Sequence, residues 1–130
     1  MCILFLVFRI PRDKRYSITR GTNTILPQLK AALTVKGNLT GDLVLMNYYD
    51  PYQNSCPNSV SIIQTFNKHV ASDMSGFGII VDVFSAFGGV STPNPNVCSY
   101  IWMCSVFHDI HSTSKGYGVI ASAFEKRTGY

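Results

Sequence analysis

The stretch Gly78-Ile79-Ile80-Val81-Asp82-Val83-Phe84-Ser85-Ala86-Phe87 decides the fold class of this chain. Its β-branched and aromatic side chains are nearly continuous, which is typical of a strand that is buried on both faces of a sheet. Gly88-Gly89 then breaks the run. We therefore predict a buried strand over residues 78–87.

Upstream of this strand, apolar runs predict two more strands, over residues 2–8 and 42–49. Between them, helical spacing predicts a helix that Thr22, Asn23 or Thr24 caps and that ends before Gly37. A second helix is predicted over residues 58–72, because one stripe of that segment is apolar. The expected buried stripe consists of Ile62, Ile63, Phe66 and Val70.

Downstream, a loop over residues 92–96 and an ambiguous apolar stretch over 97–107 precede a last helix, with Ser114 as its N-cap. Strand and helix patterns therefore alternate along the chain. Such alternation predicts an α/β fold in which helices pack on the faces of a parallel sheet.

Composition limits the classes of protein to consider. The chain of 130 residues has the size of one domain, and an apolar content of 46% excludes general disorder. The longest apolar run, residues 1–8, is too short to span a bilayer and lacks the flanks of a signal peptide. Residues 9–20 account for the whole net charge of +4, and they lack a nucleic-acid-binding motif, so no nucleic-acid partner is expected.

The four cysteines form no C-x-x-C pair, which argues against a zinc ribbon or a thioredoxin-type site. Cys98 and Cys104 are close enough in sequence to close a small loop by a disulfide. Such a bond would fit an oxidising compartment.

Three loops follow predicted strands or precede the last helix, and they are expected to meet at one edge of the sheet: residues 48–52, 85–89 and 109–111. In the last of them, Asp109 stands two residues before His111. One interpretation is a catalytic base held by its orienting carboxylate. The alternative is helix capping beside a surface histidine.

Several segments together resemble the C-terminal half of SGNH (GDSL-type) hydrolases, in the secreted bacterial esterase and lipase branch. The similar stretches run over about residues 23–124, and they are LPQLKAAL (26–33), LVLMNYYDPYQNSCP (43–57), Phe66-Asn67, VDVFSAF (81–87) and DIHSTSKGYGVIASAF (109–124). The resemblance implies a flavodoxin-like three-layer fold, a small-molecule or lipid ester as substrate, an extracellular location and no cofactor.

In that family a serine attacks the ester carbonyl, a histidine takes the serine proton and a carboxylate orients the histidine. Carried over to this chain, His111 would be the general base and Asp109 its orienter. The chain departs from the usual pattern, which has the acid three residues before the histidine and a proline after it. In this chain the residue three before His111 is His108, and the residue directly after it is Ser112.

The family's Gly-Asp-Ser and Gly-x-Asn-Asp blocks, which carry the nucleophile and part of the oxyanion hole, have no counterpart here. Gly41-Asp42 is followed by Leu43, and Ser17 lacks the glycine turn. We therefore predict an incomplete hydrolase domain over residues 23–130, preceded by a non-matching basic segment over residues 1–22, and no activity of this chain in isolation.

Three other interpretations remain open at this stage. Cys104, His108 and His111 would share a face of a helix and bind zinc there. Tyr52, in the tyrosine cluster with Tyr48 and Tyr49, is a candidate substrate contact. Finally, the chain could be a non-catalytic binding module that self-associates through an exposed sheet edge, because missing strands would leave such an edge unpaired.

Overall fold

The computed structural model describes residues 21–130, so the strand predicted over residues 2–8 and nearly all of the basic segment lie outside the described residues. The elements, in chain order, are the π-helical turn η1 (Gly21–Ile25), helix α2 (Leu26–Ala32), strands β1 (Thr34–Val35), β2 (Asn38–Leu39) and β3 (Val44–Met46), helix α3 (Ser59–Met74), strand β4 (Ile79–Val81), helices α4 (Val83–Ala86) and α5 (Val97–Tyr100), the 3-10 turn η2 (Trp102–Cys104) and helix α6 (Ser114–Thr128).

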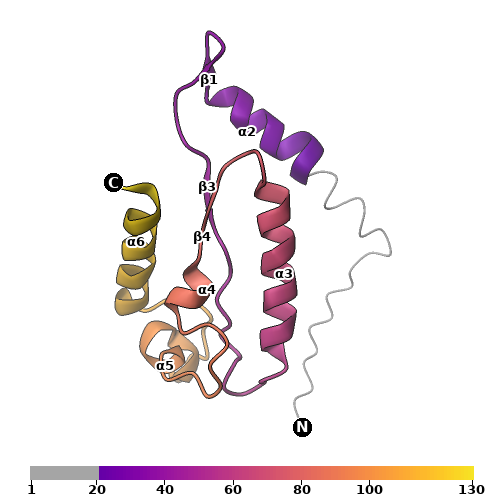
Figure 1. Cartoon of the computed structure of the whole chain (residues 1–130). Helices are drawn as coiled ribbons and strands as arrows, with labels where there is room; N and C mark the ends of the chain where they lie inside the picture. The colour runs from indigo at the N-terminus through magenta and orange to yellow at the C-terminus, as the bar shows by residue number, and fades with distance from the viewer. Residues whose placement is uncertain (1–20) are drawn as a thin grey trace.

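Strands β3 and β4 run parallel, with Val44 beside Ile79 and Met46 beside Val81. Helices α3 and α6 lie on opposite sides of this pair (Figure 1), and both contact β4. Strands β1 and β2 form a separate antiparallel hairpin. Within the part of the chain that the structure describes, each sheet has two strands. Residues 21–130 are therefore a mixed α/β structure, and they do not form the larger parallel sheet that the sequence predicted.

The hydrophobic core lies between the β3–β4 pair and the C-terminal helices. Its buried residues come from β4, from the segment after it and from the region of α5. Strand β3 and helix α6 pack against them from two sides. The buried set is Val81, Val83, Phe87, Val97 and Ile101, and the partly buried residues around it include Val44, Met46, Tyr49, Val119, Ile120, Ala123 and Phe124.

The strand predicted over residues 78–87 is wrong in its second half. The strand ends at Val81, and the next apolar residues, Val83–Ala86, form helix α4. Asp82 causes the change, because its carboxylate accepts a hydrogen bond from the Ser85 backbone N–H at 3.1 Å and so caps the helix. Val83 and Phe84 are buried all the same, so burial of this run did not require a strand.

Helix α3 occurs where the sequence predicted it, but its buried face is different. Ser59, Asn67 and Met74 are buried, whereas Ile62 and Phe66 are 55% and 45% exposed. The predicted stripe is therefore wrong for Ile62 and Phe66. The α3 face that meets the sheet includes the polar side chain of Asn67, because this amide bonds the backbone N–H and carbonyl of Tyr48.

The helix predicted before Gly37 begins and ends differently. The turn η1 leads directly into α2, and Ile25 at their junction makes no side-chain cap. The helix stops at Ala32, and the β1–β2 hairpin turns at Lys36 and Gly37, which have φ angles of 51° and 81°. The hairpin was not predicted, although glycine at a left-handed position is typical of such a turn.

Candidate active site

The three loops that the sequence placed at one edge of the sheet do meet. The Tyr49 hydroxyl donates to the Ile110 carbonyl at 2.9 Å. The Tyr49 ring stacks on the Phe87 ring, with 4.5 Å between centroids. Gln53, just beyond the first loop, donates to the carbonyls of Gly89 and Ser91 at 2.8 and 2.6 Å. These contacts fix the loop that carries Asp109 and His111 against the ends of the strands.

Asp109 holds His111 through one carboxylate oxygen. Asp109 Oδ1 lies 2.5 Å from His111 Nδ1 and also accepts the His111 backbone N–H at 2.9 Å. We assign the ring proton to Nδ1, because an ionised carboxylate is an acceptor only. That tautomer leaves Nε2 as a proton acceptor. The His111 side chain is 72% exposed, so Nε2 can be reached from solvent.

The same contacts lower the pKa of Asp109 below its ordinary value of 3.8. The backbone N–H of His111 is the largest cause, followed by the hydrogen bond from the His111 ring. Both donors favour the ionised carboxylate. Asp109 is therefore charged at neutral pH, which is the state that an orienting carboxylate needs.

Backbone contacts on both sides of His111 fix its position. The Trp102 N–H donates to the His111 carbonyl at 3.0 Å, and the Thr113 N–H donates to the Tyr100 carbonyl at 2.9 Å. Thr113 then caps α6, since its hydroxyl accepts the Gly116 N–H at 3.2 Å. The predicted cap, Ser114, is instead the first residue of the helix. His111 thus stands at the entry to α6, on backbone tied to the α5–η2 region.

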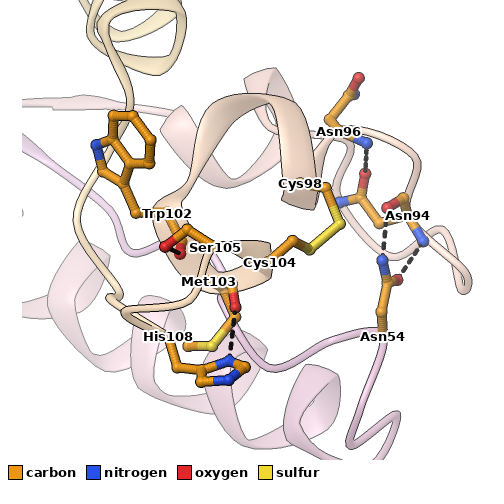
Figure 2. Close-up of a disulfide and its surroundings, with 9 residues drawn as sticks. All are labelled: Asn54, Asn94, Asn96, Cys98, Trp102, Met103, Cys104, Ser105 and His108. Carbon is orange, nitrogen blue, oxygen red and sulfur yellow. Dashed lines mark hydrogen bonds between the residues drawn. A yellow bond between two sulfur atoms is a disulfide. The ribbon is translucent and has the colours of Figure 1, made fainter.

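A disulfide joins Cys98 to Cys104 across the α5–η2 region (Figure 2), with their Cα atoms 5.1 Å apart. This is the bond that the sequence suggested. It removes the Cys104 thiolate from the zinc set considered above. The His108 ring contacts the Met103 carbonyl, 3.1 Å from Nδ1. Among the described residues no group of three metal-ligating side chains is present.

Of the three neighbouring tyrosines, Tyr49 contacts the loop of His111, and Tyr52 stays a predicted substrate contact. The contacts of Tyr52 are those of a turn: its N–H donates to Asp50 Oδ1 at 3.0 Å, and its carbonyl accepts the N–H of Cys56. Tyr48 packs edge-on against Phe66. Three neighbouring tyrosines look alike in a sequence, and no spacing rule separates the one that reaches across to residue 110.

A second polar cluster, at the carboxyl ends of β3 and β4, was missed by the sequence analysis. Asn47 donates to Asp82 Oδ1 at 2.8 Å and accepts the Phe84 N–H at 2.8 Å. The Ser85 hydroxyl donates to Asp82 Oδ2 at 2.6 Å. Partial burial by itself raises the pKa of Asp82, but the hydrogen bonds from Ser85 and Asn47 together lower it below 3.8. The sequence signal that could have predicted this cluster is Asp82, an aspartate directly after a buried strand.

No nucleophile accompanies His111 within residues 21–130. The ring of His111 bonds to Asp109, and no described hydroxyl or thiol bonds to it. The neighbouring Ser112 hydroxyl is buried and donates to Tyr49 Oη at 3.3 Å. Ser17 lies outside the described residues. Within residues 21–130 the arrangement is thus an exposed histidine paired with an ionised aspartate.

Comparison of the chain with protein-family models, with curated proteins and with solved structures finds no match. Within residues 21–130, no helix combines the length and the apolar character that crossing a membrane would require.

Proposed function

We propose that this chain carries the base half of a carboxylic-ester hydrolase site of the Ser-His-Asp type, and that it lacks the serine nucleophile. One observation carries the proposal. Asp109 Oδ1 stands 2.5 Å from His111 Nδ1, while the other ring nitrogen belongs to a side chain that is 72% exposed. A histidine arranged in this way accepts a proton from a hydroxyl group that approaches from solvent.

The chemistry follows from the two ring nitrogens. As a hydroxyl attacks the ester carbonyl, Nε2 takes its proton and the ring becomes an imidazolium. The ionised Asp109 stabilises that charge through Nδ1–H. Nε2 then gives the proton to the departing alkoxide, so the base is restored for the next step. A small-molecule or lipid ester is the substrate class, and the nucleophile would come from outside residues 21–130.

The resemblance to SGNH hydrolases would place the site at the carboxyl edge of a flavodoxin-like, three-layer sheet. In support, β3 and β4 are parallel, α3 and α6 lie on opposite sides of them, and the His111 loop lies beyond the strand ends. The Cys98–Cys104 disulfide supports secretion into an oxidising environment.

Hydrolysis of p-nitrophenyl acetate tests the base, because this activated ester reacts without a serine nucleophile. Without the nucleophile we expect no enzymatic turnover through a serine. For this activated ester we expect only slow base-assisted hydrolysis above the buffer rate, which His111→Ala abolishes and Asp109→Asn lowers about tenfold. His108→Ala is the matched control, since it removes another exposed imidazole of the same loop and should leave the rate unchanged. Equal rates for the wild type and His111→Ala would overturn the proposed base.

A fluorophosphonate probe tests the missing nucleophile, because it labels activated serines. We expect no labelled serine in the full chain and no turnover of an unactivated alkyl ester. Labelling of one serine that His111→Ala prevents would show a complete site, and the claim of a missing nucleophile would then be wrong.

A further inference from the structure

Strand β3 has one paired edge and one open edge. The Ile79 N–H donates to the Leu43 carbonyl at 2.8 Å, and the Asn47 N–H donates to the Val81 carbonyl at 3.0 Å. Alternate residues of a strand direct their backbone groups to the same neighbour, so the odd-numbered residues of β3 face β4. Val44 and Met46 therefore direct their N–H and C=O groups to the other edge, where the described residues provide no strand.

The open edge of β3 is adjacent to exposed apolar side chains. Tyr48 packs on Phe66 of α3, with ring centroids 5.1 Å apart, and Ile62 lies one helical turn before Phe66. We call Leu45, Tyr48, Ile62 and Phe66 the apolar strip; their exposed fractions are 43%, 55%, 55% and 45%. An unpaired strand edge beside an apolar strip is a surface that another extended segment can cover.

Cys56 indicates which segment of the chain covers the open edge of β3 and the apolar strip. Cys56 is buried and disulfide-bonded. The chain has four cysteines, and Cys98 and Cys104 bond to each other. Cys2 is therefore the cysteine of this chain that remains for Cys56. Cys2 also opens the apolar run of residues 2–8, which has the composition of a buried strand.

We propose that a Cys2–Cys56 disulfide anchors the N-terminal run and that residues 3–8 cover the apolar strip by pairing antiparallel with the open edge of β3. The bond forms when the two thiols lose two protons and two electrons to a disulfide oxidant such as oxidised glutathione, which is reduced to two thiols. This inference does not depend on the proposed hydrolase function.

The direction of pairing follows from the positions of the two ends of the segment. Helix α3 begins three residues after Cys56, and in Figure 1 this start of α3 lies at the end of the molecule to which β3 runs. The turn η1 contacts α3, and Lys30 of the following helix α2 bonds the Gly76 carbonyl beyond the other end of α3. A segment that starts at Cys56 and ends at Gly21 must run back against the direction of β3. The linker of residues 9–20 can extend about 3.3 Å per residue, which is ample for the return to η1.

Non-reducing tryptic mapping of the full chain tests the anchor. Trypsin would place Cys2 on peptide 1–9, Cys56 on peptide 37–68, and both Cys98 and Cys104 on peptide 69–115. We expect a linked pair of peptides 1–9 and 37–68 from protein whose free thiols were blocked before digestion. Alkylated Cys2 and Cys56 would overturn the proposal.

Amide hydrogen exchange tests the pairing. We expect the N–H groups of Val44 and Met46 to exchange at least about tenfold faster in Cys2→Ser than in the wild type. The N–H of Asn47, which bonds to β4, should change little. Cys98→Ser/Cys104→Ser is the matched control, since it removes the other disulfide and should leave the exchange of Val44 and Met46 slow.

Phe5→Asp separates the anchor from the pairing, because it keeps both cysteines but places a charge in the apolar run. We expect the disulfide to remain and the exchange of Val44 and Met46 to become fast. Equal exchange in the wild type and Cys2→Ser would overturn the pairing. Protection that is lost on dilution would assign the edge to a second copy of the chain and would overturn it as well.

Discussion

The Asn67 side chain of α3 makes two hydrogen bonds to the backbone of Tyr48, two residues after β3 ends. Asn67 Oδ1 accepts the Tyr48 N–H at 2.8 Å, and Asn67 Nδ2 donates to the Tyr48 carbonyl at 2.8 Å. The side-chain amide thus takes the place of a neighbouring strand at this residue. This pairing turns Asn67 toward the sheet, and it leaves Ile62 and Phe66 of the same helix exposed.

Replacing Asn67 with alanine should destabilise the protein by about 1–3 kcal/mol, because both backbone groups of Tyr48 lose their partner. Urea unfolding at neutral pH measures the change. Lys68→Ala is the control, since Lys68 is the exposed next residue of α3 and should change the free energy of unfolding by less than about 0.5 kcal/mol. Equal effects of the two substitutions would contradict the strand-like role of Asn67.

Gly116 lets α6 approach α5 closely. A Cβ atom at this position would lie 2.1 Å from the Tyr100 carbonyl oxygen, whereas one at Gly118 would meet nothing within 4 Å. We expect Gly116→Ala to destabilise the protein by about 1–3 kcal/mol through overpacking. Gly118→Ala should instead stabilise it by about 0.5–1 kcal/mol, because alanine favours the helix. Thermal unfolding of the two variants compares them, and stabilisation by Gly116→Ala would contradict the close contact.

The extent to which sequence predicted this structure depends on how local each feature is. Asp109 and His111 are two residues apart, so their pairing could be predicted from spacing. The contacts of Asn47 with Asp82 and of Tyr49 with Ile110 join residues 35 and 61 positions apart. Those contacts depend on strand register and on loop paths, which no local pattern determines.

Hydrophobic periodicity predicted where α3 lies in the sequence, but not which face of the helix is buried against the sheet. The pattern counts Ile62 and Phe66 as core because they are apolar, and it gives no reason to expect that Asn67 is buried. The structure leaves Ile62 and Phe66 exposed and buries Asn67 instead, since a buried amide with two backbone partners is favourable at a strand edge. The prediction for residues 78–87 failed for a similar reason, because one side chain, Asp82, ends the strand by capping a helix.

Asp82 should stabilise the protein in a pH-dependent way. Its carboxylate caps α4 and bonds Asn47 and Ser85, so Asp82→Ala should cost about 1–2 kcal/mol at pH 7. Because its pKa is lowered from 3.8, the charged form contributes stability above that value and loses it as the pH falls through the lowered pKa. The difference between the wild type and Asp82→Ala in urea unfolding should therefore shrink in acid.

Asp73→Ala is the matched control for Asp82, because Asp73 is a half-buried aspartate in the last turn of α3 that caps no helix within residues 21–130. We expect Asp73→Ala to change the free energy of unfolding at pH 7 by less than about 0.5 kcal/mol. A difference for Asp82→Ala that grows as the pH falls would contradict the stabilising role of the ionised carboxylate.

The pKa of Asp109 should distinguish the effect of the His111 ring from that of the His111 backbone N–H, because both lower it. The largest cause of its lowering is the backbone N–H of His111, which any residue at this position except proline keeps, and the ring contributes a further hydrogen bond and an electrostatic attraction. In His111→Ala we therefore expect the pKa of Asp109 to rise, but to remain below 3.8. Carboxyl ¹³C NMR titration measures it, with His108→Ala as the control that leaves it unchanged. A pKa that is the same in His111→Ala and in the wild type would show that the ring does not hold the carboxylate, and the proposed orienting role of Asp109 would fail with it.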